Sequence, residues 1–130
     1  MQASSLNQET VNDTAKLMMH RLIARLLVRD PLLLDRARVS LDQMSVLFPD
    51  RSFVVEWEEL LRLPPRQLRV LLTSRNQHMR RLRLSSPFLT AVDFRDQNLR
   101  RRIRRAAKRI VARAARRVGG HNQAIQPRAA

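Results

Sequence analysis

The 130-residue sequence contains no cysteine and only two glycines. The absence of cysteine excludes a disulfide scaffold, a thiolate zinc site and a cysteine nucleophile. Two glycines are too few for a glycine-rich loop that cradles phosphates. No apolar run approaches the roughly 18 residues that a membrane-spanning helix needs. The sequence therefore predicts neither a membrane span nor any of these sites.

The length and composition fit one helical domain with at most a short appendage. The apolar fraction is 44%, which is close to the usual globular value and argues against wholesale disorder. The first 16 residues lack an apolar stretch and carry Glu9 and Asp13, so no signal peptide is predicted and we expect a cytoplasmic location.

The net charge of +15 is concentrated in one segment. Residues 1–98 contain 15 basic residues and all 11 acidic ones, whereas residues 99–118 contain ten basic residues and no acidic one. A mildly basic domain is therefore followed by a strongly cationic segment, which points to an anionic partner.

Apolar residues recur at helical spacing along most of the chain, and proline, serine, asparagine and aspartate mark the breaks. These signals predict helices over 12–29, 31–47, 52–62, 65–72, 75–84 and 94–118. The expected caps are Asn12–Thr14, Asp30-Pro31, Asp50, Thr73-Ser74 and Asp93. Since no clear alternating pattern is present, the prediction is all-α: a compact bundle of four or five short helices, followed by a long Arg-rich C-terminal helix.

The corresponding organisation has four parts. We expect a frayed N-terminus over 1–11, a helical domain over 12–92, a cationic helix over 93–118 and a flexible tail over 119–130. The glycine pair at 119 and 120 is a typical helix end.

The cationic helix has a narrow, alanine-rich apolar stripe that suits close packing on the domain or against a second copy, so the oligomeric state stays open. Its other faces carry the candidate nucleic-acid-binding residues, which are Arg100, Arg101, Arg102, Arg104, Arg105, Lys108, Arg109, Arg113, Arg116 and Arg117.

Four interpretations of this helix are open. It contacts nucleic-acid phosphates, docks on an acidic protein, is solvated without a ligand, or binds a membrane surface. The first is preferred, with DNA favoured over RNA, because phosphate contact relieves the mutual repulsion of the cations. Membrane binding is disfavoured because the stripe lacks Trp and Phe.

Catalytic and metal chemistry is not predicted. His20, His78 and His121 are far apart and form no zinc-binding pattern. The carboxylates Glu56, Glu58 and Glu59 flank Trp57 on one short helix instead of converging on a pocket. We expect no enzyme, no metal and no cofactor.

Four stretches in order carry a resemblance: Arg29–Arg38, Glu56–Leu61, Leu68–Ser74 and Arg81–Phe88. They resemble a group of small bacterial proteins, some of which are the antitoxin-like member of a toxin–antitoxin gene pair. The similarity spans about residues 20–95, and its sharpest part is the Leu-Arg-x-Ser-Ser-Pro-Phe stretch at 82–88. Proteins of this group usually end soon after the position of Phe94, so the cationic helix departs from them.

The resemblance implies a protein that binds a partner protein, such as a cognate toxin, and that also binds DNA. The expected partner-binding residues are Arg83, Ser85, Ser86, Phe88 and Trp57. The alternative for the 82–88 turn and for Trp57 is a structural role in the core.

The preferred function is a non-enzymatic bacterial antitoxin- or regulator-like binding protein whose cationic helix contacts nucleic-acid phosphates. The alternative is an adaptor or subunit of a larger assembly, in which that helix docks on an acidic protein or an RNA surface.

Overall fold

All regular structure in the described part of the chain is helical, which confirms the all-α prediction. The computed structural model describes the backbone of residues 2–129 and the side chains of residues 8–117. The elements are α1 (Gln2–Arg29), α2 (Leu32–Leu47), α3 (Ser52–Leu61), α4 (Pro65–Leu72), α5 (Gln77–Leu82), a 3₁₀ turn η1 (Arg83–Ser85), α6 (Phe88–Ala91) and α7 (Gln97–Ala129).

Two helix starts follow the predicted proline signals. Asp30 and Pro31 separate α1 from α2, and the Leu32 N–H donates to Asp30 Oδ1 at 3.1 Å. Pro65 is the first residue of α4, where its missing N–H leaves no hydrogen bond unmade.

Other helix starts differ from the expected caps. Helix α5 begins after Asn76, whose Oδ1 accepts the Met79 N–H at 2.7 Å, so Thr73-Ser74 is not the cap. Helix α7 begins after Asp96, which accepts the Asn98 N–H at 2.9 Å, and not after Asp93. In both places several capping residues lie within a few positions, and the chain uses the last one.

The Phe48–Asp50 break also differs from the expected geometry. Asp50 has a φ of 61°, a left-handed conformation that aspartate tolerates better than most residues. The N-cap of α3 is Arg51, so Asp50 forms the turn instead of the cap.

Helix α1 starts ten residues earlier than predicted and includes Asn12–Thr14 in its interior. Val11 is buried, and the Thr14 hydroxyl donates back to the Thr10 carbonyl at 2.8 Å. The backbone of the expected frayed N-terminus is therefore helical from Gln2. The side chains of the predicted tail at 119–130 lie outside the described ones; the backbone of α7 runs to Ala129.

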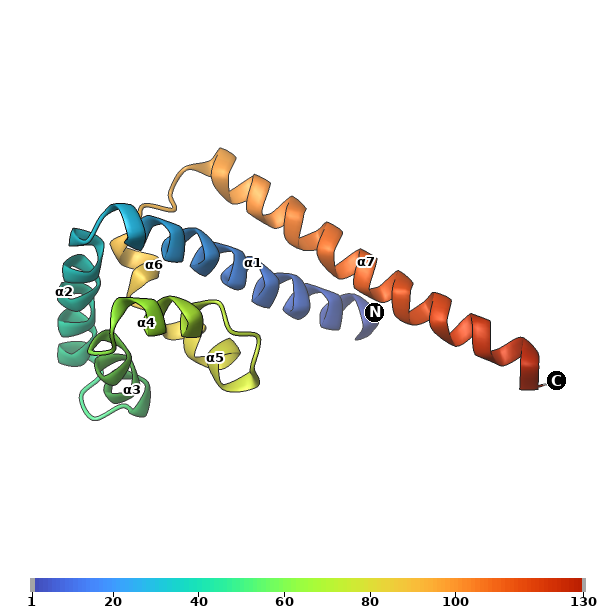
Figure 1. Ribbon diagram of the computed structural model, residues 1–130, viewed down its shortest axis with the longest axis horizontal. Coiled ribbons are helices and arrows are strands. Elements are labelled where there is room, and N and C mark those ends of the chain that lie inside the picture. Colours follow the sequence, from blue (N-terminus) through green and yellow to red (C-terminus); the bar gives the residue numbers. More distant parts are fainter. Residues whose placement is uncertain (1, 130) are drawn as a thin grey trace.

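The core lies where α1–α6 meet, and Trp57 is at its centre. The Trp57 side chain is fully buried, contacts Phe88 edge-on at a centroid distance of 6.3 Å and donates from Nε1 to the Leu82 carbonyl at 3.2 Å. In Figure 1, α2 runs downward from one end of α1, and α3, α4 and α5 lie below α1. We call α1–α6 together with residues 92–96 the body.

Helix α7 lies along α1 on the side away from α4 and runs in the opposite direction (Figure 1). It is connected to α6 by residues 92–96, in which Phe94 is buried against the core.

Among the described residues, no helix combines the length and the apolarity needed to cross a bilayer.

Candidate nucleic-acid interface

The face of α7 toward α1 is apolar and made of small side chains. Ile103 and Ala107 are buried, and Leu99, Ala106 and Val111 are half-buried. The small side chain of the buried alanine allows the backbones of α7 and α1 to approach each other closely. The stripe therefore packs α7 on α1 although it offers little apolar surface. The remaining faces of α7 are directed to solvent.

These remaining faces carry the predicted cations. All ten are exposed: Arg100, Arg101, Arg102, Arg104, Arg105, Lys108, Arg109, Arg113, Arg116 and Arg117. Among the described residues, the ion pairs within 4 Å all belong to side chains before Gln97. The cations of α7 are therefore neutralised by no carboxylate of the described chain.

Four of these cations surround one shallow hollow on α7. Arg102, Arg105, Lys108 and Arg109 line a space of about 420 Å³. Guanidinium groups bind phosphate oxygens through two parallel hydrogen bonds, and a lysine adds a point charge. The arrangement suits a polyanion that runs along the helix.

The exposed arginines of the body include several with carboxylate partners. Arg36 contacts Asp30 at 2.7 Å and Arg38 contacts Asp35 at 3.4 Å. Arg95 donates to Asp93 at 3.0 Å, and this hydrogen bond lowers the pKa of the Asp93 carboxyl below its usual value. Among the described residues of α7 no such pair is present, and the sequence has no acidic residue after Asp96.

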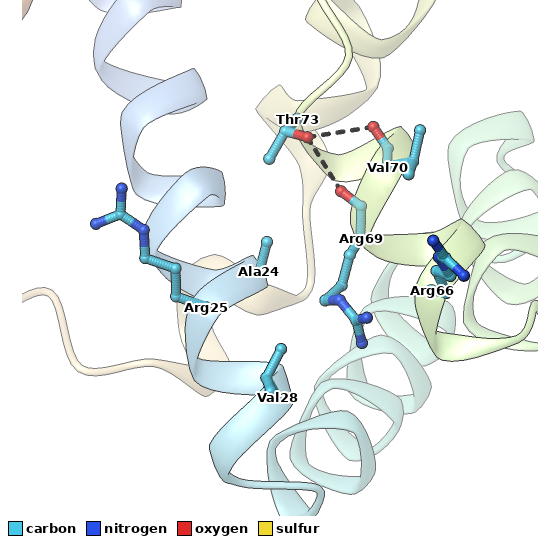
Figure 2. Close-up of a pocket in the computed structure, with 7 residues that line it drawn as sticks. All are labelled: Ala24, Arg25, Val28, Arg66, Arg69, Val70 and Thr73. Atoms are coloured by element: carbon cyan, nitrogen blue, oxygen red, sulfur yellow. Dashed lines mark hydrogen bonds between the residues drawn. The ribbon is translucent and has the colours of Figure 1, made fainter.

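A second basic groove, which the sequence did not reveal, lies between α1 and α4 (Figure 2). Arg25, Arg66 and Arg69 line a space of about 420 Å³ together with Val28 and Val70, and no carboxylate lines it. The groove escapes sequence reasoning because its two helices are some 40 residues apart in the chain.

Most side chains of the turn at 82–88 lie in the core, and Leu84 is exposed. Trp57, Arg83, Ser86 and Phe88 are all buried. The Ser86 hydroxyl accepts the Phe88 N–H at 3.2 Å. Their burial is what the structural alternative expects, and their contact with a partner protein stays a prediction.

Ser85, the fifth expected partner-binding residue, is half-buried and bonded within the body. Its hydroxyl donates to the Leu82 carbonyl at 3.0 Å and lies 3.3 Å from Trp57 Nε1. It closes the 3₁₀ turn beneath the tryptophan.

Arg83 is the most unusual member of the turn, because it is 2% exposed and has no carboxylate partner. Its Nη1 donates to the Leu72 and Ser74 carbonyls at 3.2 and 2.6 Å. These bonds tie the turn after α4 to η1. Nothing in a single sequence distinguishes this buried arginine from the many exposed ones.

His20 is the other buried ionisable group. Burial lowers the pKa of His20 to about 4, and the nearby Arg83 charge acts in the same direction. Its Nδ1 lies 2.7 Å from the Lys16 carbonyl, so in the neutral ring Nδ1 carries the proton. His20 is thus a neutral core residue at pH 7.

Metal ligands do not gather in the part of the chain that the structure describes, where no group of three His, Cys, Asp or Glu residues is placed to hold an ion. Comparison with known proteins assigns no family to the chain. No family model, curated protein or solved structure matches the chain.

Proposed function

We propose that this protein is a non-enzymatic, antitoxin- or regulator-like binding protein of bacterial type, whose Arg-rich helix α7 contacts the phosphates of nucleic acid. The observation that carries the proposal is the row of ten exposed cations without carboxylate partners. The regulator-like role is inferred from the resemblance over residues 20–95.

Electrostatics explains why the ligand should be a polyanion. Like charges three and four residues apart on a helix repel, at a cost of a few tenths of a kcal/mol per pair. Phosphate contacts remove this repulsion and release the counterions condensed on the nucleic acid. Binding should therefore be strong at low salt and weaken steeply as salt rises.

The same residues indicate how little base sequence α7 reads. Residues 99–118 contain no Asn or Gln, which are the side chains that pair with adenine, although arginine pairs with guanine. We therefore propose contacts mainly to the backbone, with duplex DNA as the favoured ligand.

The test compares two variants with the same loss of charge. One replaces four α7 cations by glutamine (Arg101, Arg105, Lys108 and Arg109); the control replaces four exposed body arginines (Arg29, Arg51, Arg62 and Arg81). We expect fluorescence anisotropy with a random duplex at 50 mM salt to show affinity falling about 100-fold or more for the α7 variant. The control should change by a few-fold.

Equal losses in the two variants would show that net charge, and not α7, is responsible. If the wild-type protein binds neither DNA nor RNA, and an acidic protein co-purifies with it from the native host in high salt, the adaptor function replaces this proposal.

A further inference from the structure

A third basic pocket lies on the inner side of α7, where this helix passes α1 and the start of α5. It measures about 320 Å³ and is lined by four arginines: Arg21 of α1, Arg75 before α5, Arg80 of α5 and Arg83 of η1. Ile110 and Ala114 of α7 contribute an apolar wall. The pocket therefore exists only where three parts of the chain come together.

The charges around this pocket do not balance. Asp13 is the one carboxylate among its lining residues, against four guanidinium groups. No ion pair within 4 Å joins any of these four arginines to a carboxylate among the described residues. Burial and the neighbouring Arg80 charge lower the pKa of Arg83, whereas Asp13 raises it. The pocket thus retains an excess of positive charge in a partly enclosed space.

Arg83 also has an unused hydrogen-bond donor. Its Nη1 is engaged by the Leu72 and Ser74 carbonyls, but its buried Nε has no partner. A buried N–H without an acceptor destabilises the folded state. An anion bound within this pocket would relieve the charge imbalance.

We propose that this pocket binds a phosphate dianion, either inorganic phosphate or the phosphate monoester group of a small phosphorylated molecule. Arg75 and Arg80 are exposed and contact the anion at the mouth of the pocket. Arg83 is buried and lies at the inner end of the pocket. Planar guanidinium groups suit phosphate oxygens. The volume lies at the small end of ligand pockets, so the ligand is no larger than a mononucleotide.

The site is separate from the outer face of α7 and carries a structural consequence. Because Ile110 and Ala114 form one wall, an anion bound to the arginines of α1 and α5 braces α7 against the body. Phosphate should therefore slow amide exchange in α7 around residues 108–114.

The experiment is calorimetric titration with inorganic phosphate and, in a second arm, with adenosine monophosphate, both at 150 mM sodium chloride. We expect saturable 1:1 binding by the wild-type protein. Arg75→Gln/Arg80→Gln should weaken it at least tenfold, because two of the four guanidiniums are lost. The matched control, Arg66→Gln/Arg69→Gln in the α1–α4 groove, should bind within twofold of wild type.

The two arms distinguish the sources of the anion. Tighter binding of the monophosphate indicates a nucleotide-like ligand, and equal affinity indicates phosphate alone. The α7 variant with four glutamines should still bind phosphate, which separates this site from the proposed nucleic-acid interface.

Circular dichroism confirms that each variant is folded, and hydrogen exchange of α7 provides a readout besides affinity. Absence of saturable binding by the wild type, or equal weakening in both double variants, overturns the proposal.

Discussion

In the body, some ionisable side chains have carboxylate partners or are sealed in the core, whereas the cations of α7 among the described residues have neither. Arg36, Arg38 and Arg95 contact carboxylates, and Arg83 is buried on backbone carbonyls. On α7 ten cations face solvent, and the chain supplies no acid beyond Asp96. The body pairs part of its charge internally, whereas no described cation of α7 has a carboxylate partner among the described residues. The comparison separates residues that maintain the fold from residues that are available for a ligand.

The largest effect on stability is expected at the centre of the body. Trp57→Ala removes a fully buried side chain together with its hydrogen bond to the Leu82 carbonyl, and should lower the free energy of unfolding by about 3–5 kcal/mol. Urea unfolding followed by circular dichroism measures this. Val46→Ala, at a side chain that is 80% exposed, should stay within about 0.5 kcal/mol. Similar small values for both would contradict the assignment of Trp57 to the core.

The next effect is a pH dependence caused by His20. Its pKa is about 4 in the folded protein and about 6.5 in the unfolded chain, so the unfolded chain binds the proton first as pH falls. Stability is therefore complete above pH 6.5 and is lost as pH falls toward 4. Between pH 7.5 and 5 the free energy of unfolding should drop by about 2 kcal/mol.

Urea unfolding over this range checks the prediction, with His20→Phe as the comparison. The variant should lose most of the pH dependence, since the carboxylates titrate mainly at lower pH. An unchanged slope would show that other groups are responsible.

A smaller effect is expected at the start of α5. Asn76→Ala removes the acceptor of the Met79 N–H and should cost about 1 kcal/mol in thermal or urea unfolding. Arg75→Ala, one residue earlier at an exposed site, should cost less than about 0.5 kcal/mol. If both substitutions prove neutral, Asn76 is not the cap.

The smallest stability effect is expected on α7 itself. Replacing Arg101, Arg105, Lys108 and Arg109 by glutamine removes no ion pair among the described residues and relieves repulsion. The free energy of unfolding should change by less than about 0.5 kcal/mol, or increase slightly. A loss of 2 kcal/mol or more would mean that these side chains maintain the fold. That result would contradict the distinction between the body and the cations of α7.

Much of the helix pattern could be predicted because local signals suffice for it. The boundaries around Asp30-Pro31 and Pro64-Pro65 follow from proline chemistry alone. The caps at Asn76 and Asp96 were missed because several capping residues stand close together and tertiary packing chooses among them. The early start of α1 was missed because Asn12–Thr14, which usually cap a helix, lie inside α1.

The candidate site likewise has features that could be predicted from the sequence and features that could not. Exposure of the α7 cations could be expected from composition, and the structure exposes all ten; their binding to nucleic acid stays a prediction. The burial of Arg83 could not be expected, since its environment is built from η1 and the turn after α4. The two arginine-lined spaces against α1 are likewise products of packing between distant segments.

The most direct test of the central claim is the salt dependence of duplex binding. We predict that the logarithm of the association constant falls linearly with the logarithm of salt concentration. The α7 variant with four glutamines should lower the magnitude of this slope by about 3 to 4, because each phosphate contact contributes about 0.9. The body variant should keep the wild-type slope. Equal slopes for the α7 variant and the wild-type protein would contradict the claim that α7 meets phosphates.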